Sequence, residues 1–141
     1  MLYFAYGSNL NLSQMAVRCP KAEPLNAMWV FDYKLIFRGV ADITHEEGAV
    51  VPVGVFNITK DCEKALDVYE GFPRLYTKVY FKIGKKEYMT YTMNSTSISP
   101  PWQGYYETIL EGYHDFGLDA AFLKKAREHS TVNYHAPKIA V

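Results

Sequence analysis

The sequence opens with an apolar and aromatic run at residues 1–5 that passes directly into Tyr6-Gly7-Ser8-Asn9. Such a run is typical of a buried strand, and Gly, Ser and Asn are turn formers that end it at once. Asn11, followed three residues later by Gln14, has the form of a capping box at the start of a helix. The beginning of the chain therefore predicts a strand, a tight turn and a helix.

A turn of this kind has a possible binding role. It exposes successive backbone N–H groups near a helix N-terminus, where they can hold an anionic group or a developing oxyanion. Gly7 has no Cβ, so a ligand can come close to the main chain there. The alternative is an ordinary strand-to-helix turn, and the tetrapeptide by itself does not choose between the two.

Length and composition narrow the class of protein. A chain of 141 residues with 49% hydrophobic and 16% aromatic residues is expected to form one globular domain over residues 1–141. Lys and Arg together number 15, as do Asp and Glu, so the formal net charge is zero. No basic run is present either, and we expect no nucleic-acid partner.

The cysteines and histidines do not predict a metal site or a cofactor. Cys19 and Cys62 lie far apart and outside any C-x-x-C pair, so the plainer interpretation is a small buried residue for each. The histidines show no metal-ligand spacing. No signal peptide and no apolar run of about 18 residues is visible, which predicts a cytoplasmic protein without a membrane partner.

Hydrophobic periodicity predicts the remaining elements. Strands are expected at residues 1–5, 25–37, 49–58, 75–83 and 87–93, and helices at residues 11–17, 60–70, 102–113 and 118–128. Residues 40–48 and 94–101 are expected to be loops, and the tail after about residue 130 gives no clear signal.

Two details refine the predicted strands. Phe31, Tyr33, Leu35 and Phe37 alternate with other residues, which predicts one buried strand face. Pro52 suggests that its strand is an edge or contains a bulge there. Strands outnumber helices and most are not joined by crossover helices, so the predicted class is α+β: a small mixed β-barrel with surrounding helices.

Glu70 is the candidate acid or base. It ends the predicted helix 60–70, four residues after Leu66 and therefore on the same face. Burial and the negative end of the helix dipole both disfavour the carboxylate and are expected to raise its pKa. A carboxyl group with a raised pKa can accept and donate a proton near neutral pH. The alternative is that Glu70 turns to solvent on a frayed last turn.

Tyr6-Gly7-Ser8-Asn9 and Leu66-Asp67-x-x-Glu70-Gly71 together resemble the γ-glutamylcyclotransferase-like family, which includes the AIG2-like proteins. The resemblance covers roughly residues 1–120 with the motifs in order. A third block of it comprises Pro100, Tyr105, Ile109, Gly112, Gly117 and Leu118. Pro101 departs from the family pattern, because many members have Ser at that position.

The resemblance implies a small closed or nearly closed β-barrel and an enzyme that acts on a small-molecule γ-glutamyl substrate. It implies that Glu70 is the general acid/base and that Tyr105 brings its hydroxyl to the pocket. The backbone N–H groups of Tyr6 to Asn9 would bind the substrate. From the residues alone, Tyr105 could equally pack within the apolar stripe of its helix.

The implied reaction needs few catalytic groups from the protein. In a γ-glutamyl amide, the substrate's α-amino group can attack the γ-carbonyl, giving 5-oxoproline and a free amine without a protein nucleophile. One carboxyl group can carry the proton, and the loop could hold either the oxyanion or the α-carboxylate. A non-catalytic small-molecule binding protein with the same pocket, or a protein-interaction domain, remains an alternative. The leaving amine and the oligomeric state are not specified by the sequence.

Overall fold

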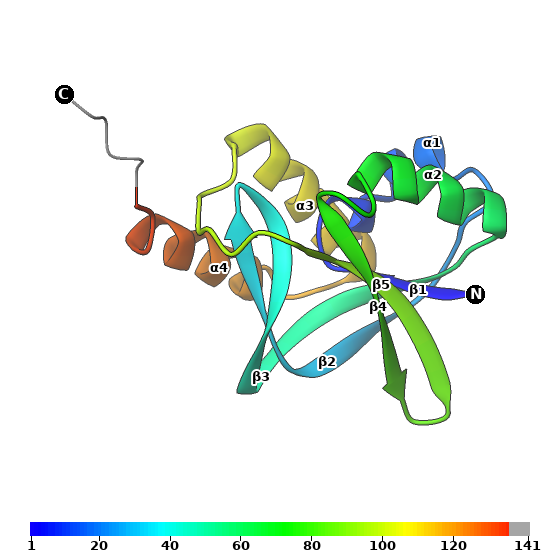
Figure 1. Cartoon of the computed structure of the whole chain (residues 1–141), viewed down its shortest axis with the longest axis horizontal. Coiled ribbons are helices and arrows are strands. Elements are labelled where there is room, and N and C mark those ends of the chain that lie inside the picture. The colour runs from blue at the N-terminus through cyan, green and yellow to red at the C-terminus, as the bar shows by residue number, and fades with distance from the viewer. Residues whose placement is uncertain (136–141) are drawn as a thin grey trace.

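The computed structural model describes residues 1–135, which form one curved sheet with the helices packed beside it (Figure 1). In chain order the elements are β1 (Leu2–Ala5), the short 3-10 helix η1 (Ser8–Leu10), α1 (Leu12–Arg18), β2 (Glu23–Arg38), β3 (Val40–Asn57), α2 (Lys60–Glu70), β4 (Tyr76–Ile83), β5 (Lys86–Met93), α3 (Gln103–Phe116) and α4 (Ala120–Val132).

The sheet has the strand order β2-β3-β1-β5-β4. The neighbours β2 and β3 form one antiparallel hairpin and β4 and β5 another, while β1 runs antiparallel to β3 and parallel to β5. The predicted α+β class is confirmed. Within residues 1–135 the outer strands β2 and β4 do not pair with each other, so the sheet is open and a closed barrel is not confirmed.

Capping residues begin α1 and α2, and end α2, where the sequence predicts. The side chain of Asn11 accepts a hydrogen bond from the Gln14 N–H at 3.1 Å, and that of Thr59 accepts one from the Cys62 N–H at 3.1 Å. Gly71 ends α2 in the left-handed conformation, with φ of 65°. A glycine adopts this conformation without the strain that a Cβ would add, so α2 stops directly after Glu70.

The prediction of a loop at residues 40–48 is wrong, because these residues form the first half of β3. They pair with the end of β2, and the pairing buries Ala41 and Ile43. Asp42 is buried as well; its carboxylate accepts a hydrogen bond from Arg38 at 2.7 Å and another from the Met93 N–H at 3.0 Å. An acidic residue that seemed suited to a loop is thus tolerated in a strand because its charge is paired.

The prediction of one continuous buried face in β2 is also wrong. The register against β3 shifts between Phe31 and Tyr33, and the intervening Asp32 has a φ of 65°. A bulge of this kind turns the strand, which leaves Phe31 72% exposed while Leu35 and Phe37 are buried.

Pro52 lies where β3 is locally an edge. It pairs with Trp29 of β2 on one side, and β1 pairs with β3 only from Gly54 onward. A proline without an N–H is tolerated there because no second strand needs the donor.

A disulfide between Cys19 and Cys62 joins the end of α1 to the first turn of α2. The interpretation of two separate cysteines is therefore wrong, although both are buried. The helices α1 and α2 pack side by side and bring the two Cα atoms within 5.0 Å of each other, across 43 positions of sequence.

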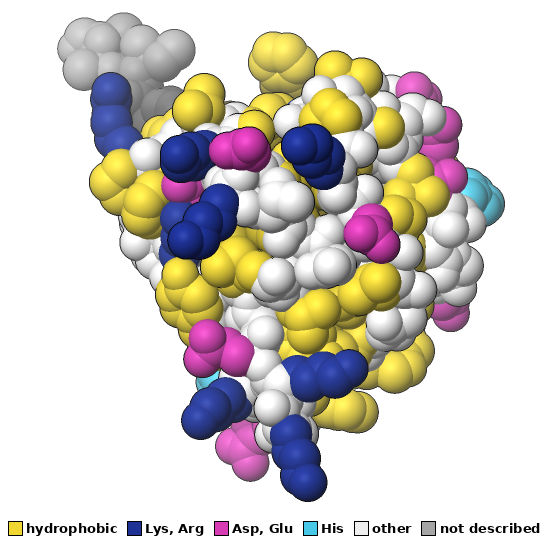
Figure 2. Space-filling model, turned by 90° about the vertical axis from the view of Figure 1, so that its right-hand side faces the viewer, with side chains coloured by type: hydrophobic (Ala, Val, Ile, Leu, Met, Phe, Trp, Pro, Cys, Tyr) yellow, Lys and Arg dark blue, Asp and Glu magenta, His cyan; other side chains and the backbone are white. Residues whose placement is uncertain are grey.

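Within residues 1–135, no helix combines the length and the apolar character that a membrane crossing requires. Figure 2 shows one face of the molecule, on which basic and acidic side chains are scattered among hydrophobic ones.

Candidate active site

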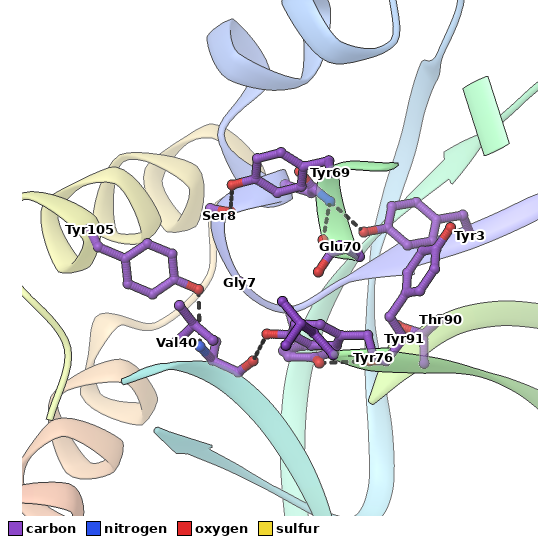
Figure 3. Close-up of a pocket in the computed structure, with 14 residues that line it drawn as sticks. Tyr3, Gly7, Ser8, Val40, Tyr69, Glu70, Tyr76, Thr90, Tyr91 and Tyr105 are labelled. Carbon is purple, nitrogen blue, oxygen red and sulfur yellow. Dashed lines mark hydrogen bonds between the residues drawn. The ribbon is translucent and has the colours of Figure 1, made fainter. Parts of the chain in front are cut away.

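A cavity of about 270 Å³ opens where the turn after β1, the end of α2, the start of β3 and the first turn of α3 come together (Figure 3). Every residue that the sequence analysis singled out for the site lines it: Tyr6, Gly7, Ser8, Asn9, Glu70 and Tyr105. Three segments far apart in the chain thus meet at one place.

Glu70 points into this cavity and does not turn to solvent (Figure 3). Burial raises the pKa of its carboxyl group to about 7, while Arg18 and the hydrogen bond from Asn9 oppose that shift. The Asn9 amide nitrogen, Nδ2, lies 3.2 Å from Glu70 Oε1 and donates to it. A carboxyl group in this state is present in both its protonated and its ionised form near neutral pH.

Asn9 is oriented by Arg18. The Arg18 Nη1 donates to Asn9 Oδ1 at 2.8 Å, and Asn9 Nδ2 also donates to the Tyr3 hydroxyl at 2.9 Å. Because the amide oxygen faces a guanidinium, the amide nitrogen has to face Glu70. The reversed amide would place its oxygen against a carboxylate, so Arg18 selects the orientation in which Asn9 donates to Glu70.

Arg18 is itself held from two sides. Its Nη2 donates to Gln14 Oε1 at 2.5 Å and to the Tyr69 hydroxyl at 2.8 Å, and its guanidinium lies 3.7 Å from the centre of the Tyr69 ring. Tyr69 in turn shares a hydrogen bond of 3.0 Å with Ser8 Oγ. The end of α1, the end of α2 and the turn after β1 are therefore connected by polar contacts around Glu70.

Tyr105 reaches the cavity from α3. Its hydroxyl accepts a hydrogen bond from the Ala41 N–H at 3.0 Å, which leaves the proton of Tyr105 available for another acceptor (Figure 3). The Tyr76 hydroxyl donates to the Ala41 carbonyl at 2.9 Å, so the start of β3 is held from both sides. Burial raises the pKa of both tyrosines, and both hydroxyls stay protonated at neutral pH.

The turn after β1 is tightly packed. The Leu10 N–H donates to the Gly7 carbonyl and the Asn11 N–H to the Ser8 carbonyl, each at 3.0 Å. These bonds form the single turn of η1 and do not use the N–H groups of Ser8 and Asn9, as expected at the start of a helix. A Cβ on Gly7 would lie 3.0 Å from Ala41 Cβ and 3.5 Å from the Tyr105 hydroxyl, so glycine suits this close approach.

The sequence patterns did not predict a role for Arg18, which lies beside the cavity, or for several tyrosines that line it. Arg18 carried one local signal, because it lies four residues after Gln14 on the same helix and is thus its neighbour on the helix surface. The tyrosines come from four different elements and share no sequence spacing. They are Tyr3, Tyr69, Tyr76 and Tyr91.

Within the described residues, no three histidine, cysteine or acidic side chains come together as a metal site would require. The arrangement instead offers one carboxyl group that titrates near neutral pH and a set of neutral hydrogen-bond donors. Such a site can move a proton and hold a small polar molecule.

Comparison with known proteins gives a consistent result. The sequence model of the family described as "Gamma-glutamyl cyclotransferase, AIG2-like" matches residues 3–114. The chain is 28% identical over 144 aligned residues to the γ-glutamylcyclotransferases of Homo sapiens and Mus musculus, covering 89% of this chain and 77% of each relative. A solved structure of a γ-glutamyl cyclotransferase superposes with a TM-score of 0.77 at 26% identity, covering 89% of this chain and 85% of that one.

Proposed function

The chain belongs to the AIG2-like γ-glutamyl cyclotransferase family of enzymes, and from this premise we propose that it cyclises a small γ-glutamyl amide, releasing 5-oxoproline and a free amine. The observation that carries the proposal is Glu70, a carboxyl group at the cavity wall whose pKa is raised to about 7 by burial. General acid/base catalysis is most effective when the pKa of the catalytic group lies near the working pH.

In this proposal Glu70 moves protons while the substrate supplies its own nucleophile. The carboxylate takes a proton from the α-ammonium, and the freed amine attacks the γ-carbonyl to form a five-membered ring. The protonated Glu70 then gives that proton to the leaving nitrogen as the bond between the γ-carbon and this nitrogen breaks. Glu70, now a carboxylate again, takes the remaining excess proton from the ring nitrogen and releases it to water, and the released amine takes up one proton from water to become an ammonium. Holding the amine against the carbonyl makes the attack intramolecular, which removes most of its entropic cost.

The neutral donors of the cavity complete the proposed site. The N–H groups of Ser8 and Asn9 are available to bind either the γ-carbonyl oxygen or the substrate α-carboxylate. The Tyr105 hydroxyl accepts from the Ala41 N–H and can turn its own proton toward the same ligand. The expectation of a cytoplasmic enzyme that needs no cofactor stays a prediction.

The second candidate is a protein that binds a γ-glutamyl compound without turning it over. The same cavity would serve both functions, so the two differ in chemistry and not in shape. The pKa of Glu70 favours the enzyme, because a site that only binds the α-ammonium of such a ligand is served better by a carboxylate that stays ionised at neutral pH than by one with a pKa of about 7.

The experiment measures 5-oxoproline released from a panel of γ-glutamyl amides by the wild type, Glu70→Gln and the control Glu128→Gln. Glu128 is an exposed residue of α4, so its substitution makes the same chemical change away from the cavity. We expect Glu70→Gln to lower kcat by about 10²-fold or more while 5-oxoproline still binds, and Glu128→Gln to behave as wild type. Undiminished turnover by Glu70→Gln would refute its role. Binding without turnover by the wild type would establish the second candidate.

A further inference from the structure

The disulfide fastens the end of α1, where the helix is otherwise largely exposed. Cys19 is the residue directly after α1, and Cys62 lies in the first turn of α2. Within α1 the last buried residue is Met15, and Val17 is 82% exposed. Cys19 is buried against α2, so its bond to Cys62 is the covalent connection that keeps this end of α1 in place.

The start of α1 and the body of α2 are held by contacts that do not involve the disulfide. Asn11, which begins α1, donates to Glu111 of α3 at 2.7 Å. In α2, Glu63 and Asp67 both pair with Lys78 of β4, at 2.9 and 3.0 Å. Opening the disulfide would therefore loosen the end of α1 and leave α2 where it is.

Arg18 directly precedes Cys19 and connects the disulfide to the active site. Its guanidinium donates to Asn9 Oδ1 at 2.8 Å and to the Tyr69 hydroxyl at 2.8 Å. Asn9 in turn donates to Glu70 at 3.2 Å. Hydrogen bonds weaken steeply as their geometry worsens, so a displacement at Cys19 would reach Glu70 through two hydrogen bonds.

The carboxyl group of Glu70 responds to the position of Arg18. The charge of Arg18 and the hydrogen bond from Asn9 both lower the pKa of Glu70, against the effect of burial. The tyrosines that face Glu70 from β1, β4, β5 and α3 have raised pKa values and stay neutral near pH 7: Tyr3, Tyr76, Tyr91 and Tyr105. The carboxylates next to these tyrosines lie in two ion pairs, Asp42–Arg38 and Asp67–Lys78. Loosening Arg18 would therefore raise the pKa of Glu70 further.

A second cavity, of about 160 Å³, gives small molecules access to the disulfide. Both cysteines line it, together with Arg18, Lys21 and Asp61. The cysteines are only 2% and 4% exposed, so this cavity is the approach to their sulfur atoms. Two cations and one carboxylate leave a net positive charge there, which favours the approach of a thiolate.

Resting on the proposed function, we propose that the Cys19–Cys62 bond is a switch that small thiols open. The closed bond holds Arg18 against Asn9 and Tyr69. Opening it releases the end of α1 and slows cyclisation at and below neutral pH.

The chemical step is thiol–disulfide exchange. The thiolate of a small thiol attacks one cysteine sulfur, a mixed disulfide forms, and the second cysteine sulfur leaves as a thiolate. A second thiol group, from the same or another molecule, then attacks the mixed disulfide and frees the first cysteine. The protein is reduced by two electrons and its two sulfurs take up the two protons that the small thiols lose. The small thiols are oxidised to one disulfide.

The test compares the oxidised wild type with the wild type reduced by dithiothreitol, with thiols counted by mass spectrometry after alkylation. Release of 5-oxoproline gives kcat/KM across a range of pH, and carbon-13 NMR of the side-chain carboxyl group gives the pKa of Glu70 independently of turnover. We expect reduction to move both the acidic limb and this pKa upward by about 0.3 to 1 pH unit. On that limb kcat/KM should fall by about two- to tenfold, and reoxidation should restore it.

Two variants test whether Arg18 transmits the change. The double variant Cys19→Ala/Cys62→Ala should have the pH profile of the reduced wild type and should not respond to dithiothreitol. Arg18→Met should have a shifted profile already, and reduction should add no further shift because the residue that links the two sites is missing.

The possible outcomes separate the switch from the function on which it rests. Equal pH profiles and equal Glu70 pKa values in the oxidised and reduced wild type overturn the inference and leave the cyclotransferase function standing. A disulfide that dithiothreitol opens only in urea-unfolded protein also overturns it, as does a reduced wild type that has lost its far-UV circular dichroism.

Two further outcomes concern Arg18 and the proposed function. A full further shift in Arg18→Met on reduction overturns the role given to Arg18. A failure of both wild-type forms to release 5-oxoproline overturns the proposed function, while the NMR titration still tests the switch.

Discussion

At the scale of single residues, two opposing influences set the behaviour of Glu70. Burial raises its pKa, and the positive charge of Arg18 together with the Asn9 hydrogen bond lowers it, so the result lies at about 7. Arg18 lies outside the cavity lining and acts through Asn9, whose amide it holds by a hydrogen bond of 2.8 Å. In the proposed enzyme Arg18 is thus a positioning residue.

Replacing Arg18 by Met is expected to shift the pH dependence of turnover. Without the guanidinium the pKa of Glu70 rises, so the limb on which kcat/KM increases with pH should move upward by about one pH unit. Arg18→Lys keeps the charge but not the two-sided hydrogen bonding, and should give a smaller shift. A Met variant that folds normally and keeps the wild-type pH profile would show that Arg18 only stabilises the end of α1.

Tyr105→Phe tests whether the hydroxyl of Tyr105 contributes to turnover. The substitution keeps the ring and its packing but removes one neutral hydrogen-bonding group, which is worth about 0.5–1.5 kcal/mol. We therefore expect kcat/KM to fall by about 2- to 13-fold with little change in the urea midpoint of unfolding. Turnover at the wild-type level would mean that the hydroxyl serves only to hold Ala41.

At the scale of elements, the site depends on how closely α3 approaches the turn after β1. A Cβ on Gly112 of α3 would come within 2.6 Å of the Leu10 carbonyl carbon and 2.7 Å of the Asn11 nitrogen. Glycine at this position lets the helix backbone pack directly on η1 and on the start of α1. The same helix carries Tyr105, so this contact sets the distance between Tyr105 and the turn that it faces.

Gly112→Ala should destabilise the fold because neither backbone can move without displacing the other. We expect a loss of about 1–3 kcal/mol in the free energy of unfolding, measured by urea titration, and a lower kcat/KM. The matched control is Gly104→Ala in the same helix, where a Cβ would meet nothing within 4 Å. That variant should gain up to about 1 kcal/mol from helix propensity, and an equal loss in both variants would contradict the close-packing argument.

At the scale of the whole molecule, the buried carboxyl group makes stability depend on pH. The pKa of Glu70 rises from an ordinary value of 4.5 to about 7 on folding, so between these values the folded chain binds a proton more tightly than the unfolded chain. Its contribution to stability is therefore greatest below about pH 4.5, falls as the pH rises through this window and stays at its lowest level above pH 7.

Glu70→Gln removes this titration and should be more stable than the wild type at pH 8. The gain is expected to reach at most about 3 kcal/mol and to disappear near pH 4, which thermal or urea unfolding at several pH values would measure. Glu128→Gln should show no such dependence. A wild type whose stability rises between pH 5 and 7 relative to Glu70→Gln would mean that Glu70 is ionised and stabilising in the fold.

Local features of the fold could be predicted from the sequence because neighbouring residues create them. The caps at Asn11 and Thr59, the stop of α2 at Gly71 and the β4–β5 hairpin all arise within a few residues. The first half of β3 could not be predicted, because its polar sequence becomes a strand only through pairing with β2 and through the ion pair of Asp42 with Arg38. The Cys19–Cys62 pair likewise needs the packing of α1 on α2.

The sequence by itself determined the local motifs and placed Glu70 at the end of a helix, on the same face as Leu66. Only the tertiary structure decided that these motifs meet, since β1 has to pair with both β3 and β5 before its turn faces α2 and α3. The tertiary structure also places Arg18 where it orients Asn9 and lowers the pKa of Glu70. It brings the tyrosines of other elements to the cavity, where burial raises that pKa. The physical reason is that burial and charge depend on all neighbours in space, whereas the sequence specifies directly only the neighbours along the chain.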